Sequence, residues 1–230
     1  MRTRLSVLVL ALALPAAAAA GEDFLMGSVV KSDRWKMDRA NDRELFDGDV
    51  SFRNPRYTLK ADHAAYSRRT KVWDIYGSVY TLRRFDDGSR VEVDCDRSVY
   101  SEGLEEARLR RGALPVRMKY TAPDGRVLRG LSDRADAANA AGRIDFAGAF
   151  TLSTENLDIH AEKGSYDNAE RSFLIHDSTP AAVGTREGYD FAINADSIKL
   201  FRDSRDIKFT DRVSGWVKDV PPAAAKQERR

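Results

Sequence analysis

Residues 47–79 read DGDVSFRNPRYTLKADHAAYSRRTKVWDIYGSV, and two short phrases within this stretch return along the chain. The first phrase alternates apolar and polar positions, then has an acidic residue, a small residue and usually Tyr, as in Leu59, Ala61, Asp62, Ala64 and Tyr66. Its acidic residue returns at Asp96, Asp133, Glu162 and Asp196, at intervals of 34, 37, 29 and 34 residues. Self-similarity at this period predicts stacked units that bury their apolar faces against their neighbours.

In the first phrase, the apolar positions before the acidic residue have odd numbers and those after it have even numbers, as at 59 and 61 and then 64 and 66. Side chains alternate between the two faces of a regular strand, so Leu59 and Ala61 would point one way and Ala64 and Tyr66 the other. One extra residue, a bulge at Asp62, restores a common direction. Each unit is therefore predicted to be two strands that meet at a corner, with the acidic residue at the outer elbow.

The second phrase is an apolar residue, then Gly two positions on, then another apolar residue two positions further. It occurs around Gly48, Gly77 and Gly148. Period two predicts a strand with one apolar face, and the glycine predicts a bend or the close approach of another part of the chain. Because no segment of useful length has helical periodicity, the predicted fold class is all-β, with two facing antiparallel sheets.

The two ends of the chain differ from the repeats. Arg2 and Arg4 precede an apolar run over residues 5–14 and small residues at 18–20, which predicts that residues 1–20 are a cleaved secretory signal peptide. The alternative is an uncleaved inner-membrane anchor. Residues 21–217 are predicted to be one β domain, and the polar residues 218–230 a disordered tail.

Charge and cysteine content exclude some classes of protein. The 38 basic residues become 36 without Arg2 and Arg4, equal to the 36 acidic residues, and this balance argues against nucleic-acid binding. A single cysteine excludes an intrachain disulfide and a multi-cysteine metal site. Cys95 occupies the small-residue position of its phrase, which predicts a packing role.

No catalytic or metal-binding constellation stands out. The chain has three scattered histidines and lacks a nucleophile elbow, a phosphate loop and a dinucleotide fingerprint, so we expect no catalytic residue, no metal and no cofactor. The five recurring carboxylates could instead supply an acid and base pair such as Asp62 and Asp96, which is the hypothesis of a secreted polysaccharide-acting β-solenoid enzyme. Because every unit carries one carboxylate, we interpret them as corner residues.

The repeated phrases resemble those of the OstA-like family, whose members include the periplasmic lipopolysaccharide-transport proteins LptA and LptC. The resemblance covers most of residues 25–215, although the unit around Asp133 departs from the pattern. It rests on Gly48, Val50, Leu59, Ala61, Asp62, Ala64, Tyr66, Gly77 and Val79. It implies a twisted, partly open β-jelly roll of about five strand-corner-strand repeats, whose apolar interior holds lipid A acyl chains and whose members stack end to end between the inner and outer membranes.

These observations lead to the hypothesis of a non-catalytic periplasmic carrier. Its partners would be lipopolysaccharide, through lipid A, the inner- and outer-membrane export components, and further copies of itself in head-to-tail contact. An apolar trough for lipid would be lined by Phe46, Val50, Phe52, Leu59, Tyr66, Ile75, Val79, Phe146, Phe150, Ile159, Ile193 and Phe209. The alternatives are an anchored, LptC-like component of the same system, the enzyme above, and a purely structural scaffold with a filled interior.

Overall fold

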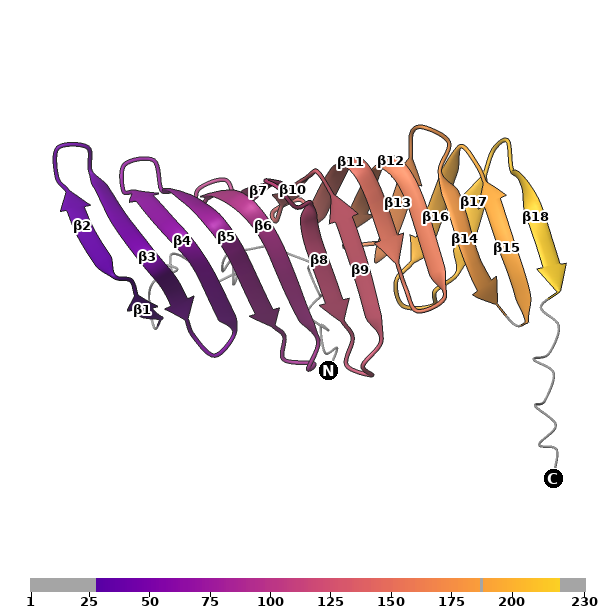
Figure 1. Ribbon diagram of the computed structural model, residues 1–230, viewed down its shortest axis with the longest axis horizontal. Coiled ribbons are helices and arrows are strands. Elements are labelled where there is room, and N and C mark those ends of the chain that lie inside the picture. The colour runs from indigo at the N-terminus through magenta and orange to yellow at the C-terminus, as the bar shows by residue number, and fades with distance from the viewer. Residues whose placement is uncertain (1–27, 187, 220–230) are drawn as a thin grey trace, which may run out of the picture.

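The computed structural model describes residues 28–186 and 188–219, and within them it consists of 18 antiparallel β-strands and no helix (Figure 1). The prediction of an all-β fold is thus confirmed. The predicted signal peptide and residues 220–230 of the predicted tail lie outside the described residues. The last strand ends at Asp219, so the predicted domain boundary at 217 falls inside it.

Six long strands form the middle of the structure. They are β3 (Arg43–Arg53), β4 (Tyr57–Ser67), β5 (Val72–Arg84), β6 (Arg90–Ser101), β11 (Arg143–Ser153) and β12 (Leu157–Asp167). The shorter strands are β1 (Val29–Lys31), β2 (Arg34–Asp38), β7 (Glu106–Arg110), β8 (Val116–Thr121), β9 (Val127–Ser132), β10 (Arg134–Ala138), β13 (Ser172–His176), β14 (Ala181–Arg186), β15 (Tyr189–Asn194), β16 (Ser197–Phe201), β17 (Ile207–Thr210) and β18 (Ser214–Asp219).

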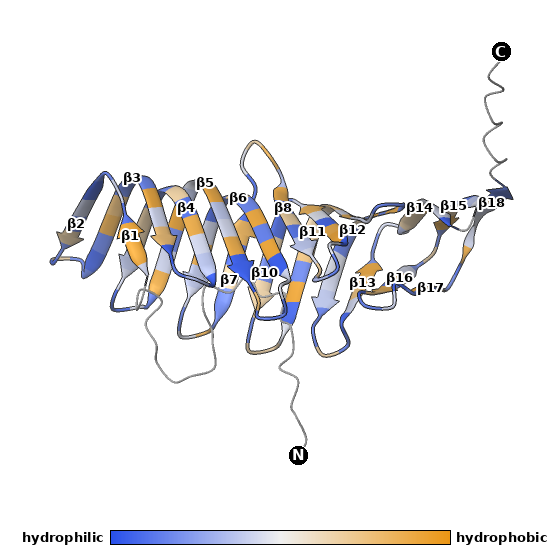
Figure 2. Cartoon of the chain, turned by 90° about the horizontal axis from the view of Figure 1, so that it is seen from below, coloured by the Kyte–Doolittle hydropathy of each residue, from blue (hydrophilic) through white to orange (hydrophobic). Residues whose placement is uncertain are grey.

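The strands build two facing layers, because each long strand bends in the middle and gives one half to each layer. In β3, β6, β11 and β12 the two halves also pair with different short strands. The first half of β3 pairs with β2, and its second half pairs with β1. Layer 1 contains β2, β7, β10, β13, β16, β17 and the halves of the long strands between them. Layer 2 contains β1, β8, β9, β14, β15, β18 and the other halves. In Figure 2 the two layers can be seen separately at one end, with β14 and β15 in one and β16 and β17 in the other.

Bulges mark these bends, as predicted, but the extra residue lies on the strand that carries the glycine and not at the acidic residue. Between β3 and β4 the register passes from Asp47 and His63 to Val50 and Ala61, so that residues 48 and 49 oppose Asp62 alone. Gly48 has φ of 74° and Asp49 of 42°, a left-handed pair that turns the strand sharply. The same two-against-one arrangement recurs between β5 and β6 and between β11 and β12.

Three of the five acidic residues at the elbows also contact a glycine of the next unit. A Cβ added to Gly77 would lie 2.5 Å from a carboxylate oxygen of Asp62, and one added to Gly148 would lie 2.5 Å from Asp133. Gly112 meets Asp96 in the same way. Asp33 packs against Gly48 in the same way, so the series of acid–glycine contacts begins one unit before Asp62, the first acidic residue that the sequence indicated. The glycine is therefore needed both for its left-handed backbone and to leave room for the carboxylate.

The layers are joined along the corner edge, and the opposite edge, where the hairpin turns lie, forms a mouth. Along the mouth of layer 1, neighbouring turns are tied together by backbone hydrogen bonds of 2.9–3.0 Å. The donors and acceptors are Arg68 to Asp42, Glu102 to Lys71, Asn139 to Glu105, Asn168 to Gly142, and Arg202 to Arg171. Layer 2 has equivalent bonds from Arg84 to Arg56 and from Thr185 to Asn156. Between described residues, no backbone hydrogen bond crosses the mouth.

Each end of the ribbon exposes two unpaired strand edges, one from each layer. Among the described strands, β1 and β2 pair only with β3, β17 pairs only with β16, and β18 pairs only with β15. Both ends expose large apolar side chains, with Trp35 59% exposed at one end and Val217 63% exposed at the other. No helix long and apolar enough to span a membrane occurs in the described part of the chain.

Candidate functional site

The residues predicted to line a lipid trough all belong to the inner faces of the two layers or to the open end of the ribbon. Nine are at most 5% exposed: Phe46, Val50, Phe52, Leu59, Ile75, Val79, Phe146, Phe150 and Ile159. The other three, Tyr66, Ile193 and Phe209, are partly buried.

Aromatic rings fill the interior between β3, β4 and β5. Trp73, which is fully buried, lies 5.4 Å from the ring of Phe52 and 6.3 Å from that of Phe46. Tyr66 stacks on Trp73 at 4.5 Å, and its hydroxyl donates to Glu102 at 3.2 Å. In this part of the molecule the predicted lining residues pack against one another rather than around an open channel.

The prediction missed Trp73, although its position carried a signal. Trp73 lies two residues before Ile75 and so shares its inward face, up to the corner at Gly77. Tyr100 and Phe173, which are also buried, face inward in the same way on β6 and β13. An alternation count on both sides of each corner would have found all three.

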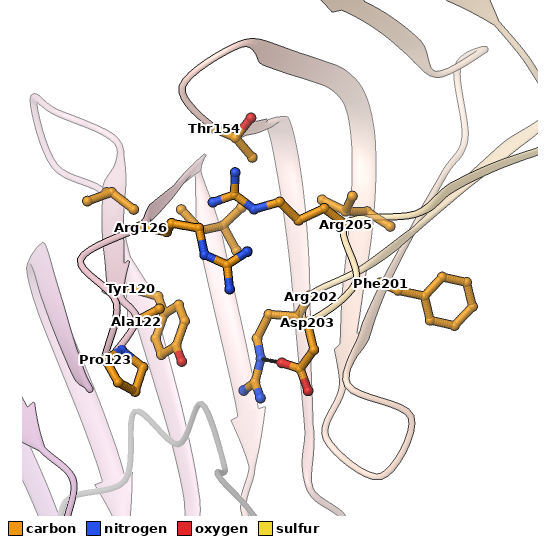
Figure 3. Close-up of a pocket in the computed structure, with 12 residues that line it drawn as sticks. Tyr120, Ala122, Pro123, Arg126, Thr154, Phe201, Arg202, Asp203 and Arg205 are labelled. Carbon is orange, nitrogen blue, oxygen red and sulfur yellow. Dashed lines mark hydrogen bonds and ion pairs between the residues drawn. The ribbon is translucent and has the colours of Figure 1, made fainter. Parts of the chain in front are cut away.

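A cavity of about 150 Å³ lies at the mouth, between turns that are distant in the sequence (Figure 3). Layer 2 contributes the turn between β8 and β9, together with Thr154, and layer 1 contributes the turn after β16. Its lining consists of Tyr120, Ala122, Pro123, Arg126, Val127, Leu128, Thr154, Leu200, Phe201, Arg202, Asp203 and Arg205. None of the twelve predicted residues is among them, because the cavity is built from turns and the prediction considered strand faces.

Three arginines give this cavity its charge. Arg126 pairs with Asp124 in its own turn, and Arg202 pairs with Asp203 at 2.9 Å. The hydrogen bond from the backbone N–H of Arg126 is the main reason that the pKa of Asp124 lies below its ordinary value. Arg205 makes no ion pair within 4 Å among the described residues.

Arg202 is buried although it is charged. Its side chain is only 7% exposed, its guanidinium lies 5.4 Å from the ring centroid of Tyr120, and it donates to the hydroxyl of Tyr166 at 3.1 Å. Contact with an aromatic face stabilises a cation, and more so when water is excluded. The arginine therefore connects layer 1 to Tyr120 of layer 2.

The recurring carboxylates have structural partners. Asp62 and Asp96 pack against glycines of the next unit, and Asp133 and Asp196 form ion pairs with Arg111 and with Arg212. These four carboxylates thus have structural contacts at the corners. Among the described residues, no group of three or more His, Cys, Asp or Glu side chains is placed to hold a metal ion.

Cys95 lies in the interior, 8% exposed. Burial raises the pKa of its thiol to about 12, with smaller contributions from Asp94 and Asp96. A thiol with such a pKa is a poor nucleophile at neutral pH, because the thiolate is the reactive form. This agrees with the packing role that the sequence predicted.

Comparison with known proteins finds similarity among solved structures. No protein family model matches the chain, and no curated protein matches it. Among solved structures, it is similar to LptH, described as the LptA homologous periplasmic component of the lipopolysaccharide transport device from Pseudomonas aeruginosa. The identity is 14%, the match covers 66% of this chain and 82% of that chain, and the TM-score is 0.29. At these values the likeness decides neither family nor function.

Proposed function

We propose that this protein is a non-catalytic periplasmic carrier that holds the lipid A part of lipopolysaccharide between its two layers, within a bridge from the inner to the outer membrane. One observation carries the proposal: two layers with apolar inner faces are joined by backbone hydrogen bonds along the corner edge and not across the mouth. The repeated phrases that resemble the OstA-like family support it from the sequence.

The driving force for such binding is large. Each CH₂ moved from water into an apolar interior gains about 0.8 kcal/mol, so an acyl chain of about a dozen carbons could gain on the order of 10 kcal/mol before entropy costs. A carrier in a series must also pass its lipid on with little change in free energy. Similar repeated units would provide similar sites.

Lipid entry requires the layers to move apart. A cavity of about 150 Å³ accepts a molecule about as large as benzene, which is far smaller than an acyl chain. The hydrogen bonds along each layer would keep the layers intact while the mouth opened, and the bulged corners would act as the hinge. The buried residues named above would then contact the acyl chains.

A purely structural scaffold is the second candidate, and the packed interior favours it. The rings of Phe46, Phe52 and Trp73 already pack against one another without a ligand. On this hypothesis the layers never part, and the protein binds no lipid between them. The two candidates therefore differ in a measurable property.

Photo-crosslinking distinguishes the two candidates. Benzoylphenylalanine in place of Tyr66, which lies on the inner face near the mouth, should capture lipopolysaccharide when the mixture is illuminated. The same residue in place of Tyr76 should not, because Tyr76 is 43% exposed and stacks on His63 outside the interior. Both replacements exchange a tyrosine for a similar aromatic residue.

The two variants must first show the same β-type circular dichroism as the unmodified protein. Capture at position 66 alone supports a carrier that binds lipid between its layers. Absence of capture at position 66, or equal capture at 66 and 76, would refute it, and the first of these outcomes favours the scaffold.

The open ends fit the bridge part of the proposal. An unpaired strand edge can accept a strand from another molecule. If one end met the other, β1 would extend layer 2 next to β18, and β2 would extend layer 1 next to β17. Both layers, and the interior between them, would continue from one copy to the next or into partners in the two membranes.

A further inference from the structure

The cavity at the mouth combines positive charge with an apolar wall. Three arginines and one carboxylate, that of Asp203, line it, which leaves a formal charge of +2. The neighbouring Asp124 and Arg171 cancel each other in this sum. Leu128 and Leu200 supply apolar surface on opposite layers.

Arg126 and Arg205 reach toward one another from opposite layers (Figure 3). Arg126 belongs to the turn between β8 and β9, and Arg205 to the turn between β16 and β17. Two cations that converge repel each other, and an anion placed between them would remove the repulsion. Guanidinium groups suit phosphate in particular, since they offer paired donors to its oxygens.

The nearby carboxylates leave this position open to an anion. Asp124 is occupied by the backbone N–H and the guanidinium of Arg126, and Asp203 is shared between Arg202 and Arg171. The charge of Arg205 helps to lower the pKa of Asp124, yet the two side chains do not come within ion-pair distance. The guanidinium of Arg205 therefore keeps its donors for a ligand.

The buried end of the cavity is also built for an anion. The side chain of Arg202 is 7% exposed, and it is held in place by Tyr120, Tyr166 and Asp203. Its charge acts through a medium with little water, where electrostatic attraction is stronger than at the surface. The arrangement therefore adds attraction without requiring Arg202 itself to move.

We propose that this cavity is the subsite for a phosphate monoester carried by an amphipathic lipid, an inference that rests on the proposed function and specifies where the head of the cargo binds. The phosphate sits between Arg126 and Arg205, and the attached hydrocarbon leaves along Leu128 and Leu200 toward the interior. Because the two arginines belong to different layers, a bound phosphate also ties the two sides of the mouth together.

Binding of two lipids to the unmodified protein tests the proposal. The probes are bis-phosphorylated lipid A and the same lipid after removal of its phosphates, with inorganic phosphate as a third probe. The phosphorylated lipid should bind at least about tenfold more tightly, because two charge-assisted hydrogen-bonded contacts are lost with the phosphate. This difference should shrink as salt is added.

A double variant, R126Q/R205Q, should bind both lipids with the same affinity. The matched control is R129Q, since Arg129 is an exposed residue on β9 that does not line the cavity. The control should keep the preference for the phosphorylated lipid. Equal affinity of the double variant and the control for the phosphorylated lipid would overturn the assignment of the site.

The outcomes with the unmodified protein separate this inference from the proposed function. If both lipids bind equally, the phosphate subsite is refuted while the carrier stands. If neither lipid binds, the carrier itself is refuted, and the subsite with it. If inorganic phosphate binds as tightly as the phosphorylated lipid, the cavity takes a free anion, and the assignment to a lipid is overturned.

Discussion

At the scale of single residues, the corners depend on a contact between an acidic residue and a glycine. Asp62 opposes Gly48 across one ladder and packs against Gly77 of the following strand. Gly77 also has φ of 78°, a left-handed conformation that costs other residues about 1–2 kcal/mol. The glycine thus satisfies a backbone requirement and a steric one together.

Gly77→Ala should destabilise the protein by more than backbone strain alone. The matched control is Gly88→Ala, since Gly88 has a similar φ of 85° and open space where a Cβ would stand. We expect the control to lose about 1–2 kcal/mol of unfolding free energy and Gly77→Ala to lose at least about 1 kcal/mol more. Urea unfolding measures both.

A double-mutant cycle with Asp62→Ala isolates the steric part of the effect. Removing the carboxylate should relieve part of the clash, so the penalty of Gly77→Ala should fall toward that of the control, although the Cβ of residue 62 would still lie 2.8 Å from the added Cβ. Equal losses for the two single glycine variants would contradict the idea that the acidic residue fixes the glycine.

Part of this arrangement could be predicted from the sequence. The change of parity at Asp62 predicted a bulge at this corner. The structure has one, but its extra residue lies on the facing strand, where Gly48 and Asp49 oppose Asp62. The contact with Gly77 was not predicted, because it joins residues that the phrases place in different units. A signal existed, since Gly77 follows Asp62 by 15 residues and Gly148 follows Asp133 by 15.

At the scale of elements, each long strand belongs to both layers, so its inner residues pack on either side of a corner. Phe146 and Phe150 of β11 flank Gly148, and their rings stack with centroids 4.9 Å apart. The ring of Phe150 also occupies the space that a Cβ on Gly164 of β12 would take. Packing at the corner therefore couples the two layers.

Phe150→Ala should cost about 3–5 kcal/mol of unfolding free energy, because the change leaves a cavity in a fully packed interior. Phe209→Ala, in the edge strand β17, should cost less than about 2 kcal/mol, since Phe209 is only partly buried. Denaturant unfolding followed by tryptophan fluorescence measures both values. A loss at Phe150 no larger than that at Phe209 would mean that the interior is loosely packed before any ligand binds.

At the scale of the whole molecule, the ribbon is open at both ends. Its end strands expose Trp35 on β2 and Val217 on β18, and each layer has a free edge at each end. Edges of this kind favour pairing with another chain unless charge or a bulge prevents it. We therefore expect head-to-tail association of copies of this protein.

Val217→Lys should weaken this association, because a charge at the edge strand must be desolvated when another strand pairs with it. Val183→Lys is the matched control, since Val183 is 47% exposed on β14, a strand that is paired on both sides. Sedimentation velocity over a concentration series should show larger species for the unmodified protein and the control than for Val217→Lys. An unmodified protein that stays monomeric throughout the series would contradict head-to-tail pairing.

The fold was more predictable than the candidate site. The alternation of apolar and polar residues around Phe46, Gly48 and Val50 involves residues that are close in the sequence. The strands and corners could therefore be predicted from it. The cavity at the mouth joins Arg126 to Arg205, which are 79 residues apart. The repeated phrases predict a turn at residues 202–205 but do not indicate that it lies against the turn of Arg126. Only the twist and spacing of the two layers bring those turns together. No pattern in the sequence indicates how close the two turns lie.

The pairing of the strands has a consequence for how long such a molecule can be. A closed barrel needs a fixed number of strands, because its last strand must meet its first. Here each strand half pairs only with its neighbours, so the hydrogen-bond pattern does not fix the number of units. Gain or loss of one unit during evolution would alter the reach of the ribbon and leave its cross-section unchanged, and reach is the quantity that a span between two fixed surfaces must match.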